Sequence, residues 1–393
     1  MKKRDVIIVG AGIGGSSAAW HMKQAGIDPL LVEKEQFPRD KPCGDGILAA
    51  LFPMFEMMGV LDEVLAAGQK TSGFTRFYNT DEDFFQMANP DAAMYCCPRY
   101  KFDDIMNKNA IRAGVDYIEN FEVVDLLMRR QQVVGVQAIH NGRTVEIESN
   151  LVVLACGSHF LPSRKLGFYE EDPEYVFYGL RGYFENVGNM EHVEFYYPDH
   201  FMPSGYIWIF PVSKTMGNVG VFITESALRK SGKTTEELLW DWAKNTKYGK
   251  ERLGGAELIG KLKGWRLPSG KHKPIHAGGV IAVGDAGNMI EAFGGGGIPQ
   301  AISAGMLAAQ TAREAIDAGD FSKDFLNHYN EAVEGLFGAT YKAMEGMRAA
   351  AFTTSDQLRE LTKYMNGPEA DLSAWLKEAT GGEVSLEQLA SHF

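Results

Sequence analysis

Residues 6–15 read Val6-Ile7-Ile8-Val9-Gly10-Ala11-Gly12-Ile13-Gly14-Gly15, and this stretch decides the fold. Four consecutive apolar residues are typical of a strand buried on both faces of a parallel sheet. The spacing Gly-x-Gly-x-x-Gly follows the strand directly and opens an expected helix over residues 16–25. A second apolar strand over residues 29–33 ends in an acid, Glu33. These elements form one βαβ unit.

Each residue type in this unit suits a dinucleotide. Gly10 permits a tight turn, Gly12 lets the backbone approach a diphosphate, and Gly15 lets the helix pack closely on the sheet. The amino-terminus of the helix attracts the diphosphate through its dipole and its free N–H groups. Glu33 can accept hydrogen bonds from an adenosine ribose and would repel a 2′-phosphate. FAD and NAD both remain open from this motif alone.

Length and composition describe an ordinary globular chain. It has 393 residues, of which 45% are hydrophobic and 23% are charged. Because single cores stop growing near ~250–300 residues, we expect two cores. The net charge of −12 disfavours nucleic-acid partners, since an acidic surface repels phosphates.

The four cysteines include no C-x-x-C pair, so we expect no metal site, and their small number favours a reducing, cytoplasmic compartment. The apolar run after Met1-Lys2-Lys3-Arg4 is too short for a signal peptide. No apolar stretch approaches the ~20 residues that span a bilayer. At most, peripheral contact with a membrane is expected.

The rest of the chain predicts an α/β protein in which two domains interleave. Apolar strands at 151–155 and 279–283 are expected to join the first two strands in one parallel sheet. An antiparallel meander is expected over 121–128, 133–139 and 143–148, and residues 74–95 look irregular. The fold class is therefore a Rossmann-like dinucleotide-binding domain with an interleaved antiparallel-sheet substrate domain and carboxy-terminal helices. The expected boundaries are 1–45, 96–165 and 278–320 for the first domain, 46–95 and 166–277 for the second, and 321–393 for the helices.

A second acid at a strand end distinguishes between the two dinucleotides. Gly284-Asp285 follows the late strand, and a glycine run over 294–297 precedes a long helix expected from Ile298 to Ala318. A carboxylate there can bind the ribityl chain, which FAD has and NAD lacks. The helix amino-terminus at Gly296, Gly297 and Ile298 would stabilise negative charge on the pyrimidine edge of a flavin. The alternative is an Asp cap beside a flexible loop.

With these two signatures the chain resembles the glutathione-reductase-like FAD superfamily, in its aromatic-hydroxylase-type branch. Three stretches are similar to the geranylgeranyl reductase family, and this resemblance covers about residues 1–320. The chain departs from that family where Gly295-Gly296-Gly297-Ile298 replaces the usual Gly-Glu-Gly-Ile. The resemblance implies FAD-dependent saturation of carbon–carbon double bonds in isoprenoid chains. The three stretches are Lys41-Pro42-Cys43-Gly44-Asp45-Gly46, Tyr206-Ile207-Trp208-Ile209-Phe210-Pro211, and Gly284-Asp285-Ala286-Gly287 with Gly294–Ile298.

Three aromatic residues alternate in the second of these stretches. Tyr206, Trp208 and Phe210 share one face of a strand that Pro211 ends. Such a face can form the wall of an apolar substrate pocket. The alternative is plain packing between sheet and helix.

Cys43 and Arg99 have both a functional and an ordinary interpretation. The resemblance implies that the loop with Cys43 and Gly44 lies against a flavin, where the thiol could donate a proton, as could Tyr206. The alternative for Cys43 is a small buried apolar residue. The resemblance also implies that Arg99 contacts the cofactor, whereas the residue alone is more typical of a surface charge.

These observations favour an FAD-dependent reductase that acts on an isoprenoid or another apolar small molecule. The electron donor would be NAD(P)H or a small iron–sulfur protein. A flavin monooxygenase or halogenase is the enzymatic alternative, although a halogenase needs a lysine beside its substrate and the strand at 206–211 has none. A flavin electron carrier without turnover of its own is the third hypothesis.

Overall fold

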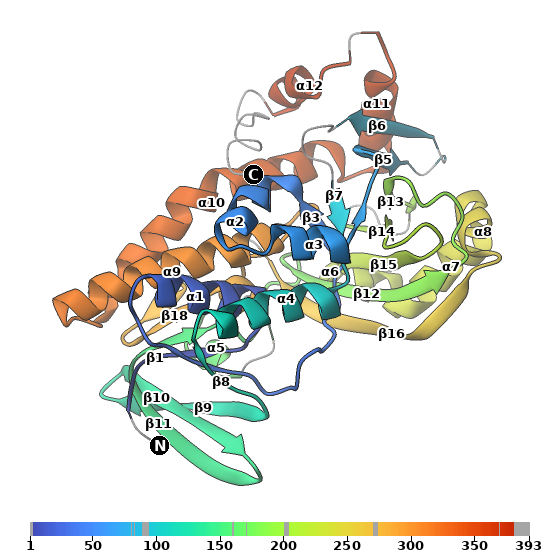
Figure 1. Ribbon diagram of the computed structural model, residues 1–393. Coiled ribbons are helices and arrows are strands. Elements are labelled where there is room, and N and C mark those ends of the chain that lie inside the picture. The colour runs from blue at the N-terminus through green and yellow to red at the C-terminus, as the bar shows by residue number, and fades with distance from the viewer. Residues whose placement is uncertain are drawn as a thin grey trace.

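The structure is a computed structural model of the chain. Helices and strands carry the labels of Figure 1. The described residues are 3–79, 81, 83–88, 94–158, 161–169, 171–199, 204–269, 274–368 and 370–380.

The predicted βαβ unit is confirmed. Strand β1 (Arg4–Val9) pairs in parallel with β2 (Leu30–Val32), and α1 (Ile13–Gln24) connects them. The helix begins three residues earlier than expected, directly after Gly12. The apolar residues of β1 are buried because strands flank it on both sides and helices cover it.

The parallel sheet contains the four predicted strands and two that the sequence did not assign to it. Its strand order is β17-β18-β11-β1-β2-β8, with β17 antiparallel at one edge. Helix α9 (Ile298–Ala318) packs closely on α1, since a Cβ on Gly305 would lie 2.7 Å from the Gly14 carbonyl oxygen. The remaining strands of this sheet are β8 (Asp116–Ile118), β11 (Arg143–Leu154), β17 (His276–Ala277) and β18 (Val280–Ala282).

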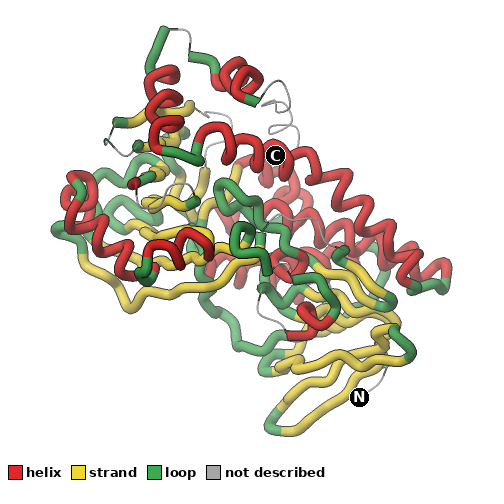
Figure 2. Tube along the Cα trace, turned by 180° about the vertical axis from the view of Figure 1, so that it is seen from behind, coloured by secondary structure: helices red, strands yellow, loops and turns green. Residues whose placement is uncertain are grey.

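The predicted meander is confirmed, with one correction. Strands β9 (Phe121–Arg129) and β10 (Gln132–His140) pair antiparallel, and β10 pairs with β11. The expected strands at 143–148 and 151–155 are one continuous strand, β11, which leaves the meander and enters the parallel sheet. Figure 2 shows the meander projecting at one end of the molecule, far from the carboxy-terminal helices.

A second sheet forms the other half, with the order β16-β12-β15-β14-β13-β5-β6. Residues 74–95 were expected to be irregular, and this was wrong for their described part, which contributes β5, β6 and β7. A small third sheet, β3-β7-β4, lies between the halves. The strands are β3 (Gly46–Leu48), β4 (Gln69–Lys70), β5 (Phe74–Tyr78), β6 (Phe84–Ala88), β7 (Met94–Cys96), β12 (Val176–Glu185), β13 (Val193–Tyr196), β14 (Gly205–Pro211), β15 (Gly217–Thr224) and β16 (Glu257–Pro268).

Helices cover both halves. Helix α10 runs alongside α9 from the parallel sheet toward the second sheet, where α11 packs on β6 (Figure 1). Apolar residues of α10, α11 and α12 share one core with the aromatic residues of β14. No described helix is long and apolar enough to cross a membrane. The other helices are α2 (Phe52–Met57), α3 (Leu61–Ala67), α4 (Arg99–Arg112), α5 (Leu161–Lys165), α6 (Glu225–Ser231), α7 (Thr235–Asn245), α8 (Lys247–Leu253), α10 (Lys323–Ala351), α11 (Ser355–Met365) and α12 (Leu372–Ala379), with single 3₁₀ turns at Ala49–Leu51 and Gly284–Gly287.

Candidate active site

The turn between β1 and α1 requires its glycines. Gly10 has a φ of 100°, and a Cβ there would lie 2.5 Å from the Ala155 carbonyl oxygen. A Cβ on Gly15 would lie 1.9 Å from the Gly10 carbonyl oxygen. Gly12 provides no side-chain cap for α1, so the first N–H groups of this helix remain available for an anion.

Glu33 lies beside this turn at the end of β2. Its buried carboxylate accepts a hydrogen bond from the Ala11 N–H at 2.9 Å. Arg39, which the sequence analysis missed, lies over the same turn. Its guanidinium is 3.7 Å from Glu33 and 2.6 Å from Asp103, and a Cβ on Gly12 would lie 3.3 Å from it. A cation above a helix amino-terminus suits a diphosphate, but a loop arginine gives no such signal in the sequence.

Arg99 is a buried ion-pair partner, so its interpretation as a surface charge was wrong. In the first turn of α4, its Nε lies 2.5 Å and its Nη2 3.0 Å from the two carboxylate oxygens of Asp103. Burial alone would lower the pKa of Arg99, but Asp103 and a hydrogen bond with the Cys43 side chain raise it. A permanent cation therefore lies beside the Cys43 sulfur.

The loop that carries Cys43 is held at several points by ion pairs. Asp40 contacts Arg181 at 2.5 Å and Lys263 at 2.6 Å, which ties the loop to the second sheet. Lys41 contacts Asp285 at 2.7 Å, which ties it to the end of β18. The loop therefore bridges the two halves of the molecule.

The aromatic residues of β14 share one face, as predicted. The ring centroids of Tyr206 and Trp208 are 6.2 Å apart, and those of Trp208 and Phe210 are 6.3 Å apart. Their exposed fractions are 5%, 6% and 8%, whereas Ile207 and Ile209, on the opposite face, are fully buried. We call Tyr206, Trp208 and Phe210 the aromatic wall. It touches the Cys43 loop, because a Cβ on Gly44 would lie 2.9 Å from Phe210.

The glycine run before α9 meets the other end of the aromatic wall. The Tyr206 hydroxyl donates to the Gly294 carbonyl at 2.5 Å. Gly297, the N-cap of α9, has no capping side chain, so the amino-terminus of α9 at Ile298 remains available. Asp285 lies in the 3₁₀ turn that begins at Gly284, between β18 and this run.

Glu291 fixes this glycine run, and the sequence analysis missed it. The buried carboxylate accepts hydrogen bonds from the N–H groups of Phe293, Gly294 and Gly296 at 2.7–2.9 Å. Burial raises its pKa, and these hydrogen bonds oppose the rise. A lone acid before a glycine run is the signal that could have identified it.

The carboxy-terminal helices close the far side of the aromatic wall. Phe352, directly after α10, packs on Tyr197 and Phe293 with centroid separations of 4.9 and 4.5 Å. Tyr197 in turn contacts Tyr206. The tail packs into the core of the protein, since Tyr329, Phe337 and Tyr341 are buried.

The predicted site residues therefore lie in one region of the fold, which extends from the turn between β1 and α1 to the start of α9. Gly10, Gly12, Gly15 and Glu33 form one end, and Asp285 with the start of α9 forms the other. The Cys43 loop, Arg99 and the aromatic wall lie between them, and Pro211 ends β14 beside them. No group of acids, histidines or cysteines suited to a metal ion occurs within the described ranges.

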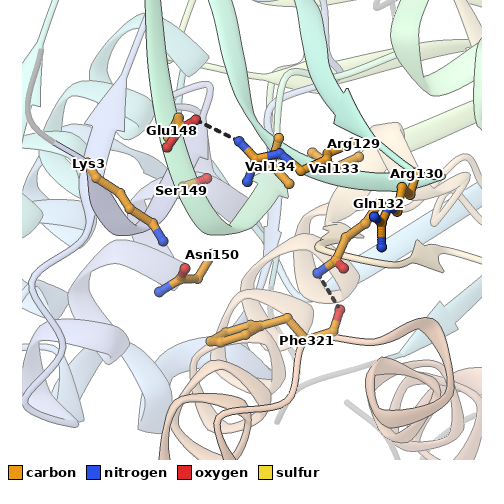
Figure 3. A pocket seen from close by; sticks show the side chains of 10 residues that line it. All are labelled: Lys3, Arg129, Arg130, Gln132, Val133, Val134, Glu148, Ser149, Asn150 and Phe321. Atoms are coloured by element: carbon orange, nitrogen blue, oxygen red, sulfur yellow. Dashed lines mark hydrogen bonds and ion pairs between the residues drawn. The ribbon is translucent and has the colours of Figure 1, made fainter.

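A separate cavity of about 390 Å³ lies at the opposite edge of the parallel sheet, where β1 begins. Figure 3 shows Lys3 and Asn150 on one side of it and Gln132, bonded to the Phe321 carbonyl, on the other. None of the predicted site residues lines this cavity.

The chemistry of these residues fits FAD: an acid suits the ribose, a helix start with a cation suits the diphosphate, and a second acid and a second helix start suit the ribityl chain and the flavin. Two relatives differ in the chemistry that they are named for. Digeranylgeranylglycerophospholipid reductase 1 of Methanococcoides burtonii is 29% identical over 90% of this chain and 85% of that protein. The 1H-pyrrole-2-carbonyl-(peptidyl-carrier protein) chlorinase of Pseudomonas fluorescens is 26% identical over 83% of this chain and 79% of that protein.

A solved structure supports the fold. The geranylgeranyl bacteriochlorophyll reductase-like protein from Thermoplasma acidophilum superposes with a TM-score of 0.83 at 23% identity, over 100% of this chain and 97% of that one. The predicted fold class, the FAD cofactor and the resemblance to geranylgeranyl reductases are confirmed. Because residues 3–333 match the FAD binding domain family, the chain belongs to that family and is an FAD-dependent oxidoreductase.

Proposed function

We propose that the chain saturates carbon–carbon double bonds in an isoprenoid chain of the geranylgeranyl type. The observation that carries the proposal is the aromatic wall, which touches the Cys43 loop at Phe210 and the glycine run at Tyr206. An apolar surface between a thiol and the flavin end of an FAD site suits a substrate that has no polar group at its reacting carbons. The relatives named as digeranylgeranylglycerophospholipid reductases support the same substrate class.

The cofactor contacts are part of the proposal. Gly10, Gly12, Gly15 and Glu33 would hold the adenosine diphosphate half, together with Arg39. Gly284, Asp285, Gly296, Gly297 and Ile298 would hold the ribityl chain and the flavin, beside Cys43, Gly44 and Arg99. Residues 1–45, 96–165 and 278–320 would then form the FAD-binding domain, and residues 46–95 and 166–277 the substrate domain.

Reduced FAD supplies the hydride that adds to one alkene carbon. The Cys43 thiol donates the proton to the other carbon, so that two hydrogens are added to each double bond. Arg99 stabilises the thiolate left behind, because its guanidinium lies near enough to the Cys43 side chain for the two to interact electrostatically. Tyr206 is the weaker donor, since its hydroxyl already donates to Gly294 and burial raises its pKa well above the usual range. The aromatic wall orients the chain and excludes water.

The reductant and the membrane contact follow from the substrate. NAD(P)H or a small iron–sulfur protein would reduce the bound FAD, because the single dinucleotide motif is used by FAD itself. A polyisoprenoid lipid resides in a membrane, so the enzyme would contact the membrane surface to reach it.

The test uses the FAD-loaded protein, reduced with dithionite under anaerobic conditions. Geranylgeranyl diphosphate and a digeranylgeranylglycerol phospholipid are supplied separately, and products are analysed by mass spectrometry. A gain of two hydrogens per reduced bond is expected. No gain on either substrate, with FAD bound and reduced, would reject the proposal.

A halogenase is the second candidate, because the chlorinase of Pseudomonas fluorescens is a relative of comparable identity. Strand β14 has no lysine beside the proposed substrate position. In addition, the Glu291 carboxylate already accepts hydrogen bonds from three backbone N–H groups at the glycine run. These three donors are therefore not available to bind a halide. Halogenated product formed with oxygen, bromide and a phenol or pyrrole would favour this candidate over the reductase.

A further inference from the structure

Asn218, inside the buried strand β15, joins the aromatic wall to the Cys43 loop. Its Nδ2 donates to the Cys43 carbonyl at 2.7 Å and to the Asp45 carboxylate at 2.8 Å. Its Oδ1 accepts from the Trp208 indole N–H at 3.0 Å. An indole N–H only donates, and carbonyl and carboxylate oxygens only accept, so the amide has one orientation that satisfies all three partners. One fully buried side chain therefore sets the loop relative to the wall.

Asp45 holds the loop from its other side. Besides Asn218, its carboxylate accepts hydrogen bonds from the Tyr183 hydroxyl at 2.6 Å and the Arg99 backbone N–H at 3.2 Å. Its carbonyl accepts from the Cys97 N–H at 2.9 Å. Asp45 has a φ of 69°, which is costly for a residue other than glycine, and these contacts maintain it. The backbone after Cys43 is thus held in one conformation.

The packing leaves the loop little room to move. Gly44 lies against the wall so closely that a Cβ there would be 2.9 Å from Phe210 Cε2 and 3.6 Å from Trp208 Nε1. Asp45 and Asn218 are both fully buried, and neither forms part of the aromatic wall. Their contacts act on Cys43 through its carbonyl and the next two residues.

We propose that Asn218 and Asp45 are positioning residues that fix the Cys43 thiol at a set distance from the aromatic wall. The importance of that distance for catalysis rests on the proposed function, in which Cys43 donates the proton. The fixed position itself can be measured without turnover. The charged or titratable groups that face Asp45 are Arg99 on α4, Tyr183 and Arg181 on β12, and Cys43, Cys96 and Cys97 on the adjoining loop and strand.

The experiment measures how fast iodoacetamide alkylates Cys43 in FAD-loaded protein, with each cysteine resolved by peptide mass spectrometry. The variants are Asn218→Ala, Asp45→Asn and Trp208→Phe, the last of which removes the indole N–H together with part of the ring. The matched control is Glu194→Gln. Glu194 is a buried carboxylate on the opposite face of the same sheet, where it accepts from Tyr196 at 2.8 Å and pairs with Arg252 at 2.8 Å.

Asn218→Ala and Asp45→Asn, which we call the loop variants because both release the Cys43 loop, are expected to raise the alkylation rate of Cys43 about threefold or more. The reason is that local opening of the loop exposes the thiol. Trp208→Phe should give a smaller rise, and Glu194→Gln none. Unchanged Cys43 alkylation in the loop variants that fold, judged by circular dichroism and retained FAD, would overturn the proposal. Should Asn218→Ala not fold, Asp45→Asn and Trp208→Phe decide the question.

Catalysis gives a separate measurement. With a polyisoprenoid substrate, kcat should fall about tenfold in Asp45→Asn while KM stays within about twofold, because the variant misplaces the proton donor and leaves the wall intact. Wild-type protein that reduces no isoprenoid would count against the proposed function alone, since the alkylation result does not depend on it.

Discussion

At the scale of single residues, Asp45 has an unusual environment for a carboxylate. It is fully buried, and burial raises its pKa to about 6, although hydrogen bonds from Tyr183 and Asn218 lower it. The folded-state pKa therefore lies above the ordinary value of 3.8. Proton uptake thus favours the folded state, and this contribution is complete below pH 3.8 and lost as the pH rises through about 6.

Replacement of Asp45 by Asn should remove this pH dependence. A shift of about two pKa units corresponds to ~3 kcal/mol. Relative to wild type, the variant should therefore gain up to about that much unfolding free energy between pH 4 and pH 7.5. Urea denaturation of both proteins at the two pH values measures the difference. Parallel pH profiles for the two proteins would show that Asp45 does not titrate in this range.

Cys43 carries the second prediction at this scale. A general acid contributes about 10²–10⁴-fold to a rate, so Cys43→Ala should lower kcat for alkene reduction by roughly 100-fold and leave KM nearly unchanged. Steady-state kinetics with reduced FAD measure both. Cys156→Ala serves as the control, because this half-buried cysteine lies outside the aromatic wall. Equal losses in the two variants would contradict the role of Cys43.

The sequence pointed to Cys43, Glu33 and Asp285 because each follows a recognisable strand or motif. It gave no signal for Asn218 or Asp45, whose partners lie far away along the chain. The side chain of Asn218 contacts Asp45 across 173 residues, and only the folded sheet brings the two together. The burial of Arg99 was missed for a related reason. Its pairing with Asp103 spans one helical turn and is visible as a spacing, but the sequence does not reveal that the fold buries the pair.

At the scale of elements, the glycine run before α9 depends on a single acid. Glu291 accepts three backbone hydrogen bonds from it, and the run would otherwise be free to adopt many conformations. The N-terminus of α9 is thereby held in place for the flavin. Glu291 therefore holds in one conformation a glycine run that is flexible by composition.

Glu291→Gln should weaken FAD binding about tenfold, because an amide cannot accept all three hydrogen bonds and a charged hydrogen bond contributes ~1.5–3 kcal/mol. Fluorescence titration of apoprotein with FAD measures the dissociation constant. Glu314→Gln, on the exposed side of α9, is the control and should bind FAD as the wild type does. A variant with unchanged affinity would mean that the glycine run holds its shape without the acid.

Elements were predictable where several signals agreed. Strand β1, the turn and α1 combine an apolar run, required glycines and a helical pattern, and α9 has the expected bounds. Strand β5 was missed because one of its pairing partners, β13, lies about 120 residues later. The continuity of β11 was missed because the polar stretch before Leu151 resembles the end of a strand, while in the fold it still pairs with β10.

At the scale of the whole molecule, the residues proposed to bind FAD come from distant parts of the chain, between Gly10 and Ile298. Ligand bound only to the folded state stabilises it, by ~2.7 kcal/mol at a concentration 100 times the dissociation constant. For a chain of this length that corresponds to a rise of about 3 °C in Tm. Differential scanning calorimetry of apoprotein with and without FAD measures the rise. An unchanged Tm in protein that has demonstrably bound FAD would contradict preferential binding of FAD to the folded state.

The overall architecture was predictable because parallel strands from distant segments must share one sheet, which forces the domains to interleave. The position of the tail was not, since its apolar faces do not reveal which surface they cover. In the structure, apolar residues of α10, α11 and α12 share one core with the aromatic wall.

This placement of the tail has a consequence for biosynthesis. The strands of the parallel sheet have all been synthesised once β18 has emerged from the ribosome, whereas the helical residues that share a core with the aromatic wall lie between Ala343 and Leu376 and follow much later. In a nascent chain the aromatic wall therefore stays exposed for some time after it has been synthesised. During this time, binding to chaperones or to lipid competes with docking of the final helices.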